Sequence, residues 1–329
     1  MYKRQVECTD PVVYWLASSI ETSLQRGVWY PTTIASNDYK SYNSLKNVYN
    51  TDSDNAVMLD FALHSFGSRG VTSRETAEVG GLAHLIFFKG TDDLVALVAG
   101  REYYNCEMAG FSVVATEHSV QCSYGFDNQM SYLNRVLDVY GTDSGIVSVV
   151  MDGYDIYREV DLLCSEHFVN RIKQSGCKFV VRPDSGDPFI VIPALLDKLA
   201  KAYGTTKNSK GKLVLNNVGI IQGDGINPTT LILLAQKVHS LGYAPECVIY
   251  GSGGGLLQKV DRDTYSFAQK TSAIRVGNEW ISTVKSPITD GGKKSKGGRL
   301  DSDQFITYYE NSKLLVDESL DTIRKRALS

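Results

Sequence analysis

The sequence predicts an α/β fold in which short parallel strands alternate with helices. From about residue 82 onward the same unit recurs: an apolar run of strand length, a glycine or polar cluster, and a segment with helical periodicity. The runs carry apolar residues on both faces, which is typical of parallel strands covered by helices. Their number and spacing favour a barrel over an open sheet.

Six apolar runs are expected to be strands, and each ends just before a group of polar, charged or glycine residues. In chain order they are residues 84–88, 111–114, 146–151, 178–181, 218–221 and 247–250. The carboxyl ends of parallel strands lie at one end of a barrel. The groups that follow these strands are therefore expected to meet around a single pocket.

The segments between the later strands have helical patterns. The expected helices are residues 157–175, 193–203 and 229–241. Asn227 followed by Pro228 is typical of a helix N-terminus, because an Asn side chain caps free backbone N–H groups and proline suits the first turn. Residues 205–212 are expected to be a surface insertion.

The two ends of the chain lack this repeat and are expected to form a second, smaller domain. Ahead of the barrel we expect helices over 14–24 and 73–82, and a strand or turn over 28–31. After it we expect polar β segments, a hairpin over 307–316 and a short basic helix near 320–326. The expected division is 1–80 for the N-terminal part of the added domain with its entry helices, 81–257 for the barrel core, and 258–329 for the basic loop and hairpin.

Composition places the chain among ordinary soluble globular proteins. Of its 329 residues 43% are hydrophobic, and 34 Lys+Arg against 37 Asp+Glu give a net charge of -3. Such a balance provides no general attraction for nucleic acid or anionic lipid, so no nucleic-acid partner is expected. No run approaches the roughly 18 apolar residues of a membrane span, so no membrane association is expected. The six cysteines share no metal-ligand spacing and are expected to be reduced thiols of a cytoplasmic protein.

Acidic residues follow three of the expected strands. Asp152, Asp184 and Asp224 stand just after the third, fourth and fifth of them, and Arg182 precedes Asp184. A turn with an internal ion pair is the ordinary explanation of the Arg182 segment taken alone. Several carboxylates at one end of a barrel repel one another unless they bind hydroxyl groups or a cation. Ribose hydroxyls and Mg²⁺ match that chemistry.

A glycine-rich run follows the last expected strand. Residues 251–255 read Gly-Ser-Gly-Gly-Gly, which lets the backbone approach an anion and point N–H groups at a phosphate. The spacing matches neither the dinucleotide fingerprint nor the P-loop, and a tight turn explains it about equally well. Cations downstream favour a polyphosphate ligand for the set, although the basic run 291–299 taken alone is expected to be a solvated loop. These cations are Lys259, Arg262, Lys270, Lys285 and those of the basic run.

His118 is the histidine whose position points to chemistry. It follows the expected strand 111–114, at the end of the barrel where Asp152 and Arg182 are also expected. A histidine there can serve as a base, a ligand or a phosphoryl acceptor, and composition does not choose among these roles.

Taken together and in order, these segments resemble the nicotinamide phosphoribosyltransferases, a branch of the type II phosphoribosyltransferase family. The similarity runs from about Thr9 to the C-terminus. Its motifs are FKGTD at 88–92, EHS at 117–119, DGYDIY at 152–157, RPDSG at 182–186, IQGDG at 221–225 and residues 251–258. The resemblance implies an incomplete α/β barrel with an added, partly β domain, and a homodimer with shared active sites. Family members carry an N-terminal segment ahead of the position that Met1 matches, and it supplies an aromatic side chain to the neighbouring subunit's site.

The resemblance implies a pentosyltransferase reaction that belongs to NAD salvage. Nicotinamide and 5-phosphoribosyl 1-pyrophosphate would give nicotinamide mononucleotide and pyrophosphate with Mg²⁺, and ATP would be a coupled co-substrate through a phosphohistidine at His118. Three alternatives stay open: a nicotinate phosphoribosyltransferase, a truncated non-catalytic nucleotide-binding homologue, and a barrel enzyme acting on another sugar phosphate. The last would need a Schiff-base lysine or a metal cluster at a strand end, and Lys89 is its weak candidate.

The resemblance also assigns roles to individual residues. The catalytic set is His118, Asp184, Arg182 and Asp152. The substrate-binding set is Phe66, which would stack on the pyridine ring, with Arg69, Asp92, Ser112, Val113, Ser148, Gly223, Asp224, Gly253, Gly254 and Arg262. The phosphate-binding set is Lys270, Lys285 and Lys293, and no metal ligands are assigned.

Asp92 is expected to decide between nicotinamide and nicotinate. A carboxylate accepts a hydrogen bond from the amide NH₂ of nicotinamide but repels the carboxylate of nicotinate. A site built around such a polar contact discriminates by roughly 10⁴-fold or more. Nicotinate phosphoribosyltransferases, the nearest relatives, are expected to lack this acid, so Asp92 favours nicotinamide as the substrate.

Overall fold

The computed structural model describes residues 5–141, 145–299 and 306–329, and the chain divides into two compact units. The larger unit comprises Ile34–Val260 and Ser319–Ser329, and the smaller comprises Met1–Thr33 and Asp261–Glu318. The expected boundary at residue 80 falls inside helix α3 (Arg74–His84), whereas that at residue 257 lies close to Val260. The assignment of functions to these ranges stays a prediction.

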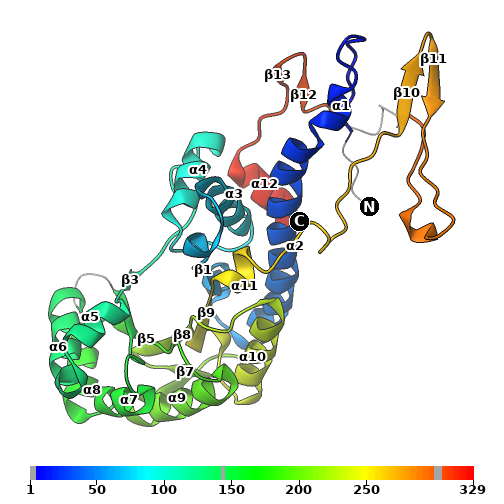
Figure 1. Cartoon of the computed structure of the whole chain (residues 1–329). Helices are drawn as coiled ribbons and strands as arrows, with labels where there is room; N and C mark the ends of the chain where they lie inside the picture. Colours follow the sequence, from blue (N-terminus) through cyan, green and yellow to red (C-terminus); the bar gives the residue numbers. More distant parts are fainter. Residues whose placement is uncertain (1–4, 142–144, 300–305) are drawn as a thin grey trace. The chain divides into compact units, whose positions relative to one another are not determined.

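A seven-stranded parallel sheet forms the centre of the larger unit (Figure 1), in the order β2-β1-β9-β8-β5-β4-β3. Its strands are β1 (Leu63–Ser65), β2 (Gly90–Thr91), β3 (Val114–Ala115), β4 (Ile146–Val150), β5 (Lys178–Arg182), β8 (Val218–Gln222) and β9 (Val248–Ser252). A bridge between Gly90 and Phe111 joins the β2 edge to the segment that leads into β3. The sheet therefore curls into an incomplete α/β barrel, as expected.

Four of the expected strands are confirmed as β4, β5, β8 and β9, with small shifts of their ends. The expected strand 111–114 is shorter and shifted to β3. The sequence did not predict β1, because its three residues include the polar His64 and Ser65, both of which are buried. Alternation and apolar runs are weak signals for a strand this short.

The expected strand over 84–88 is wrong. Helix α3 ends at His84, turns follow it, and β2 begins only at Gly90. Leu85 and Phe88 are fully buried because they pack into the core from the end of the helix, and this packing explains the apolar run. A short apolar run does not distinguish a buried helix end from a buried strand.

Helices cover the outside of the sheet (Figure 1). They include α6 (Gln129–Tyr140), α7 (Ile156–Leu163), α8 (Glu166–Ser175), α9 (Pro188–Tyr203) and α10 (Pro228–Ser240). The expected single helix over 157–175 is therefore two helices. The expected helix over 193–203 begins earlier, because Asp187 Oδ1 accepts a hydrogen bond from Phe189 N at 2.9 Å and caps it. The helix after Asn227 is confirmed, and Asn227 Oδ1 accepts from Thr229 N at 2.9 Å and Thr230 N at 3.1 Å.

The expected strand or turn over 28–31 is also wrong, because these residues lie inside α2 (Glu21–Asp52), which follows α1 (Leu16–Ser19). Pro31 removes one N–H from the helix hydrogen-bond ladder. Thr33 Oγ1 donates to Trp29 O at 2.6 Å, so a side chain joins the hydrogen bonding of this turn. Trp29 and Tyr30 favour a strand, but the helical residues on both sides of them override this preference.

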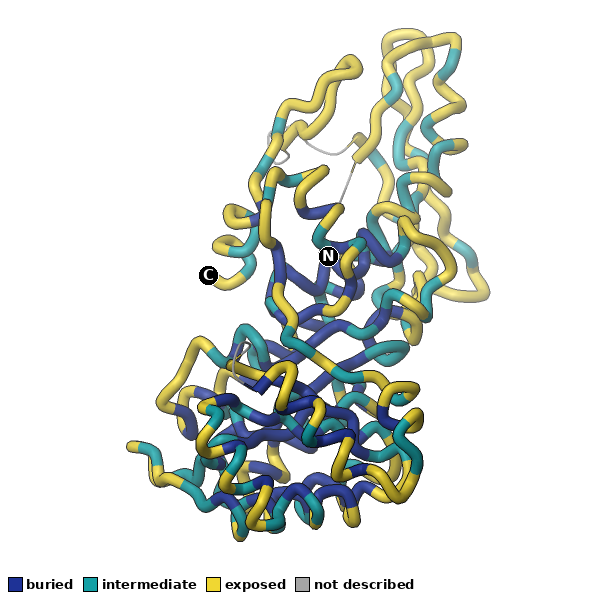
Figure 2. The backbone as a smooth tube through the Cα atoms, turned by 90° about the vertical axis from the view of Figure 1, so that its left-hand side faces the viewer, coloured by how far each residue is buried: buried dark blue, intermediate teal, exposed yellow. Residues whose placement is uncertain are grey.

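The described residues of the smaller unit include two antiparallel hairpins. They are β10 (Ala273–Val276) with β11 (Glu279–Ser282), and β12 (Tyr309–Glu310) with β13 (Lys313–Leu314). The second confirms the hairpin expected over 307–316. The described residues of 261–318 are all exposed or partly buried (Figure 2).

The C-terminal helix and a further hairpin belong to the larger unit. Helix α12 (Leu320–Leu328) confirms the expected basic helix. Strands β6 (Thr205–Lys207) and β7 (Leu213–Leu215) pair as a hairpin, so the expected insertion 205–212 supplies one strand and the turn.

The apolar core lies between the sheet and the surrounding helices, where buried residues gather on the strands (Figure 2). Val147, Val149, Phe179 and Val181 of the central strands are fully buried. This packing fixes the strands and hence the residues at their carboxyl ends. In the described part of the chain, none of the helices has the length and apolar character needed to cross a membrane.

Candidate active site at the carboxyl ends of the barrel strands

Phe66 lies among the residues that follow β1, β8 and β9. Its backbone N–H donates to Ser252 O at 2.9 Å, which ties the end of β1 to the end of β9. A Cβ atom on Gly251 would lie 1.9 Å from Phe66 Cε2, and one on Gly223 would lie 3.6 Å from the same atom. A Cβ on Gly253 would lie 3.4 Å from Phe66 O. The Phe66 ring therefore lies against the backbone of β9, a position that only glycine at 251 allows.

Asp152 joins the ends of three strands. Its Oδ1 lies 2.9 Å from His118 Nε2, at the start of helix α5 (His118–Ser123). Its Oδ2 accepts from Asp184 N at 2.9 Å and from Ser185 Oγ at 2.6 Å. The Asp152 side chain is only 3% exposed, whereas that of His118 is 37% exposed. Both Asp152 oxygens are bonded within the protein, and the partly exposed imidazole is held against one of them.

Asp184 lies against the backbone of the next strand. A Cβ on Gly223 would be 2.8 Å from Asp184 Oδ1, so glycine at 223 lets the carboxylate approach. Burial raises the pKa of Asp184, Arg182 lowers it, and the negative charges of Asp152 and Asp224 raise it further. Like charges thus gather here, and hydroxyl donors or a cation would relieve their repulsion.

Arg182 at the end of β5 is held by Thr116, which follows β3 on the far side of β4. Arg182 Nη2 donates to Thr116 O at 2.9 Å, and Arg182 Nε is buried with no hydrogen-bond partner in the described residues. Thr116 Oγ1 accepts from Tyr132 OH at 2.7 Å and from Val150 N at 3.0 Å. Thr116 N also donates at 3.0 Å to the carbonyl oxygen of the predicted site residue Ser148 in β4. Sequence reasoning missed Thr116, because a neutral residue in this segment carries no charge or spacing signal.

Asp92 directly follows β2, at the same end of the barrel as Phe66. Its backbone N–H donates to Ser65 O at 3.0 Å, and its Oδ1 accepts a hydrogen bond from Ser112 Oγ. Ser112 and Val113 lie between the bridge at Phe111 and strand β3. The exposed carboxylate of Asp92 is thus oriented by one of the other predicted site residues.

The glycine run after β9 leads into a short helix, α11 (Gly254–Leu257), with Gly253 as its N-cap residue. A Cβ on Gly255 would lie 2.2 Å from Ile226 O, so close packing requires glycine there. Gly253 and Gly254 keep this part of the backbone free of side chains. Asp224 lies on the adjacent turn after β8, and its carbonyl oxygen accepts from Gln222 Nε2 at 2.9 Å.

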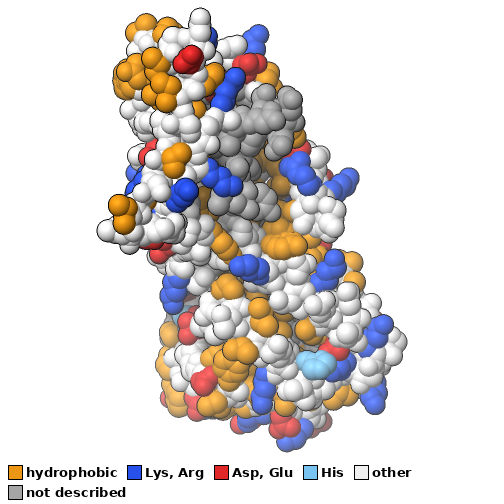
Figure 3. All heavy atoms as spheres, turned by 90° about the vertical axis from the view of Figure 1, so that its right-hand side faces the viewer, with side chains coloured by type: hydrophobic (Ala, Val, Ile, Leu, Met, Phe, Trp, Pro, Cys, Tyr) orange, Lys and Arg blue, Asp and Glu red, His pale blue; other side chains and the backbone are white. Residues whose placement is uncertain are grey.

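The predicted phosphate-binding cations lie in the smaller unit. Arg262, Lys270, Lys285 and Lys293 are all exposed. Arg262 pairs with Asp263 at 2.7 Å, and Lys293 lies 3.5 Å from Asp290. On the face drawn in Figure 3, Lys and Arg side chains stand mostly singly among neutral atoms. The other predicted site residues, including Arg69 in the turn η2 (Ser68–Gly70), belong to the larger unit. The roles of both groups stay predictions.

Lys89 stands at the opposite end of its strand from the site. It precedes β2, so it lies at the amino end, and its Nζ pairs with Asp60 Oδ2 at 2.7 Å. The sequence placed it after a strand, because residues 84–88 were expected to be one. The described residues contain no group of three or more His, Cys, Asp or Glu side chains that could hold a metal ion.

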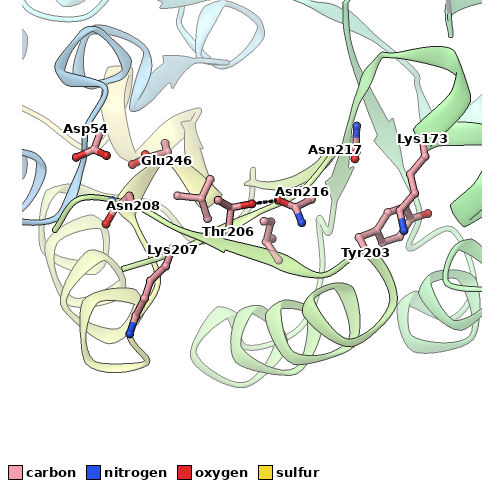
Figure 4. A pocket seen from close by; sticks show the side chains of 11 residues that line it. Asp54, Lys173, Tyr203, Thr206, Lys207, Asn208, Asn216, Asn217 and Glu246 are labelled. Atoms are coloured by element: carbon pink, nitrogen blue, oxygen red, sulfur yellow. Dashed lines mark hydrogen bonds between the residues drawn. The ribbon is translucent and has the colours of Figure 1, made fainter. Parts of the chain in front are cut away.

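A polar hollow of about 770 Å³ opens at the amino ends of the strands (Figure 4). Its lining includes Asn217 just before β8 and Glu246 just before β9. Thr206 Oγ1 donates to Asn216 Oδ1 at 2.7 Å across its floor. The residues that line the hollow include none of the predicted site residues.

Comparisons with known proteins agree with the family suggested by the motifs. The profile of the nicotinate phosphoribosyltransferase (NAPRTase) family matches residues 61–314, a range that includes all seven barrel strands. A nicotinamide phosphoribosyltransferase of Xanthomonas campestris pv. campestris (strain 8004) is 40% identical over 98% of this chain and 74% of its own length. Those of Mycoplasma pneumoniae and Acinetobacter baylyi are 31% and 30% identical, over 91% and 97% of this chain and 66% and 71% of their own lengths.

Proposed function

The chain belongs to the nicotinate phosphoribosyltransferase (NAPRTase) family, and from this premise we propose that it transfers the 5-phosphoribosyl group of 5-phosphoribosyl 1-pyrophosphate to nicotinamide. The products are nicotinamide mononucleotide and pyrophosphate, which places the reaction in NAD salvage. The observation that carries the proposal is that Phe66, Asp92 and Asp184 follow different strands yet lie at one end of one barrel.

Asp92 and the relatives favour nicotinamide over nicotinate. The relatives compared are named nicotinamide phosphoribosyltransferases, although the matching family profile is named for nicotinate. The Asp92 carboxylate, held by Ser112, accepts a hydrogen bond from the substrate amide and repels a substrate carboxylate. The Phe66 ring stacks on the pyridine ring, and Arg69 contacts the amide oxygen or the pyrophosphate side.

Catalysis rests on positioning and electrostatic stabilisation. Breaking the bond between C1 and pyrophosphate develops positive charge on the ribose ring and negative charge on the leaving group. The pyridine nitrogen already has a free lone pair, so attack on C1 needs no strong base. Asp184 accepts hydrogen bonds from the ribose hydroxyls, and the adjacent carboxylates favour positive charge on the ring. Asp152 holds both Asp184 and His118 in place.

His118 is the proposed link to ATP. Its Nε2 faces the Asp152 carboxylate, which accepts a hydrogen bond from the Nε2–H and so favours the tautomer with its lone pair on Nδ1. Attack by Nδ1 on the terminal phosphorus of ATP forms the phosphohistidine and releases ADP. The side chain is 37% exposed, so a nucleotide can reach it.

The remaining parts of the proposal concern phosphates, metal and assembly. The backbone at Gly253 and Gly254 binds the 5′-phosphate, and the cations of the smaller unit bind further phosphate groups. Mg²⁺ would be held by the substrate pyrophosphate together with one or two carboxylates at this end of the barrel, and it would offset the negative charge of the leaving group. We also propose a homodimer with shared sites and a cytoplasmic location.

An assay of the purified chain tests this function. The chain is incubated with nicotinamide, 5-phosphoribosyl 1-pyrophosphate and Mg²⁺, with and without ATP, and nicotinamide mononucleotide and pyrophosphate are quantified. We expect both products in equal amounts, with ATP increasing the yield. Product from nicotinate but not from nicotinamide would favour the nicotinate enzyme. Binding of the substrates without either product would favour a non-catalytic nucleotide-binding protein.

A further inference from the structure

Asp93 is a buried carboxylate next to the exposed Asp92. The residue is 2% exposed, and its backbone N–H donates to Thr91 Oγ1 at 3.0 Å. No catalytic, substrate or metal role described above uses it. A buried carboxylate is costly unless its oxygens are hydrogen-bonded, so its partners indicate what it does.

The two oxygens of Asp93 are bonded to the end of β1 and to the turn that follows it. Oδ2 accepts a hydrogen bond from Ser65 Oγ, and Oδ1 accepts one from Ser68 N at 3.0 Å. Ser65 is the last residue of β1 and is fully buried, and Ser68 begins η2. The carboxylate therefore bridges the two ends of the turn between these serines. Because Asp93 closely follows β2, this links the turn to the end of β2.

The turn held by Asp93 carries the residues proposed to contact nicotinamide. Phe66 lies within the turn, and Arg69 follows it in the chain. Asp92 precedes Asp93, and its backbone N–H donates to Ser65 O at 3.0 Å. One buried side chain thus connects the segments that bear the stacking ring, the guanidinium group and the carboxylate that selects the amide.

The charge of Asp93 is set by its surroundings. The pKa of Asp93 is raised: burial raises it most, hydrogen bonds from Ser65 and Ser68 and the nearby His84 lower it, and the charge of Asp92 raises it further. His84 is fully buried, and its Nδ1 lies 2.8 Å from Asp38 Oδ2.

We propose that Asp93 is a positioning residue for nicotinamide binding. It fixes the positions of Phe66 and Arg69 relative to Asp92. This inference rests on the proposed function, because it concerns the same substrate pocket. Ser65 and Ser68 both present donors to Asp93, and a carboxylate can accept both at once. The role predicts a selective effect on nicotinamide, since the residues near β4 and β5 that are proposed to meet the ribose have other supports.

Steady-state kinetics of Asp93→Ala and Asp93→Asn test the inference. Asp93→Ala leaves two buried donors without acceptors, and we expect the KM for nicotinamide to rise roughly tenfold or more. The KM for 5-phosphoribosyl 1-pyrophosphate should stay within about twofold of wild type. Asp93→Asn keeps both contacts, because its Oδ1 accepts from Ser68 N and its Nδ2 can donate to the Ser65 hydroxyl. Its KM for nicotinamide should therefore stay within about threefold of wild type.

Two further variants separate positioning from general loss of structure. Ser65→Ala removes one of the two bonds and should raise the nicotinamide KM by a smaller factor, which keeps the test available if Asp93→Ala does not fold. Glu78→Ala is the matched control, because Glu78 is 8% exposed and bonds to Arg74 at 2.7 Å on the same helix. It should leave both KM values unchanged.

The outcomes distinguish this inference from the proposed function. No turnover by the wild-type chain would overturn the function, and the inference with it. With an active wild type, an unchanged nicotinamide KM in Asp93→Ala would overturn the inference alone. An equal rise in the KM of both substrates, or Asp93→Asn behaving like Asp93→Ala, would also overturn it, because neither result fits positioning through hydrogen bonds.

Discussion

The two ends of the barrel carry similar carboxylates in opposite environments. At the carboxyl ends, Asp152, Asp184 and Asp224 gather, and the negative charges of the other two raise the pKa of Asp184, which burial already raises. At the amino ends, Asp52 pairs with His239 and lies 3.3 Å from Lys212 Nζ. Burial acts to raise the pKa of Asp52, but hydrogen bonds from His239, Thr51 and Lys212 outweigh it and the pKa is lowered.

This difference indicates that the two ends serve different purposes. In the amino-end cluster, Asp52 ties α2 to α10 through His239 and to the turn between β6 and β7 through Lys212, so the ionised form of Asp52 stabilises the fold. The carboxyl-end acids repel one another, so their ionised form favours a ligand that brings hydroxyl groups or positive charge. Variants at the carboxyl ends should therefore change activity, and variants at the amino ends should change stability.

The largest expected effect is on substrate choice at Asp92. Asp92→Ser should lower kcat/KM for nicotinamide by roughly 10³–10⁴-fold, because the amide loses its acceptor. Nicotinate should lose far less, since the repulsion of its carboxylate is also removed. Parallel assays with the two substrates measure the ratio, and thermal unfolding should be unchanged because the side chain is exposed. Equal losses with both substrates would remove Asp92 from the specificity role.

His118→Ala should abolish the coupling of the reaction to ATP without changing the fold. We expect stimulation by ATP to disappear while a slower ATP-independent reaction remains, because the phosphoryl acceptor is lost and the ribose contacts are kept. Rates measured with and without ATP give the stimulation directly. The imidazole is partly exposed, so unfolding free energy should change by less than about 1 kcal/mol. Unchanged ATP stimulation would contradict the phosphohistidine assignment.

The sequence predicted the elements whose signal is local. Strands β4, β5, β8 and β9 are continuous apolar runs, and the cap at Asn227 needs only its own neighbours in the chain. Prediction from the sequence failed where packing between distant segments decides the secondary structure. Residues 84–88 are apolar because they end a buried helix, and β1 is polar because His64 fits against Gly90, where a Cβ would lie 2.4 Å from the ring.

The candidate site was predictable to the extent that charge and glycine mark it. The acids after the strands and the glycine run were expected at one end of the barrel, where the structure has them, and the resemblance supplied individual roles that stay predictions. Thr116 and Asp93 were missed because their importance lies in contacts with distant segments. No role was predicted for Gly251, since the ring that excludes a side chain there is that of Phe66, which follows β1, a strand that was not expected.

The amino-end cluster gives the matched stability test. Asp52→Asn should lower the free energy of unfolding at neutral pH by about 2 kcal/mol, because Lys212 and His239 lose a buried carboxylate partner. The folded pKa of Asp52 is lowered, so its contribution is complete above the unfolded value near 3.8 and is lost as the pH falls through the folded value. Urea unfolding at several pH values should show wild type and variant converging in acid. The activity of the folded fraction should be unchanged. A loss of turnover would contradict the view that the amino end serves stability alone.

Asp184→Asn should produce the smallest change in stability, a gain, together with a loss of activity. The folded pKa of Asp184 is raised, so its ionised form destabilises the fold at pH values above the folded pKa, and this cost disappears as the pH falls below the unfolded value near 3.8. The variant should therefore be more stable than wild type by about 0.5–1 kcal/mol at neutral pH, and equally stable in strong acid. Turnover should fall steeply at the same time, because an amide accepts fewer hydrogen bonds from the ribose hydroxyls. Urea unfolding beside the product assay measures both quantities, and a variant that is less stable at neutral pH would contradict the view that this end of the barrel gives up stability for binding.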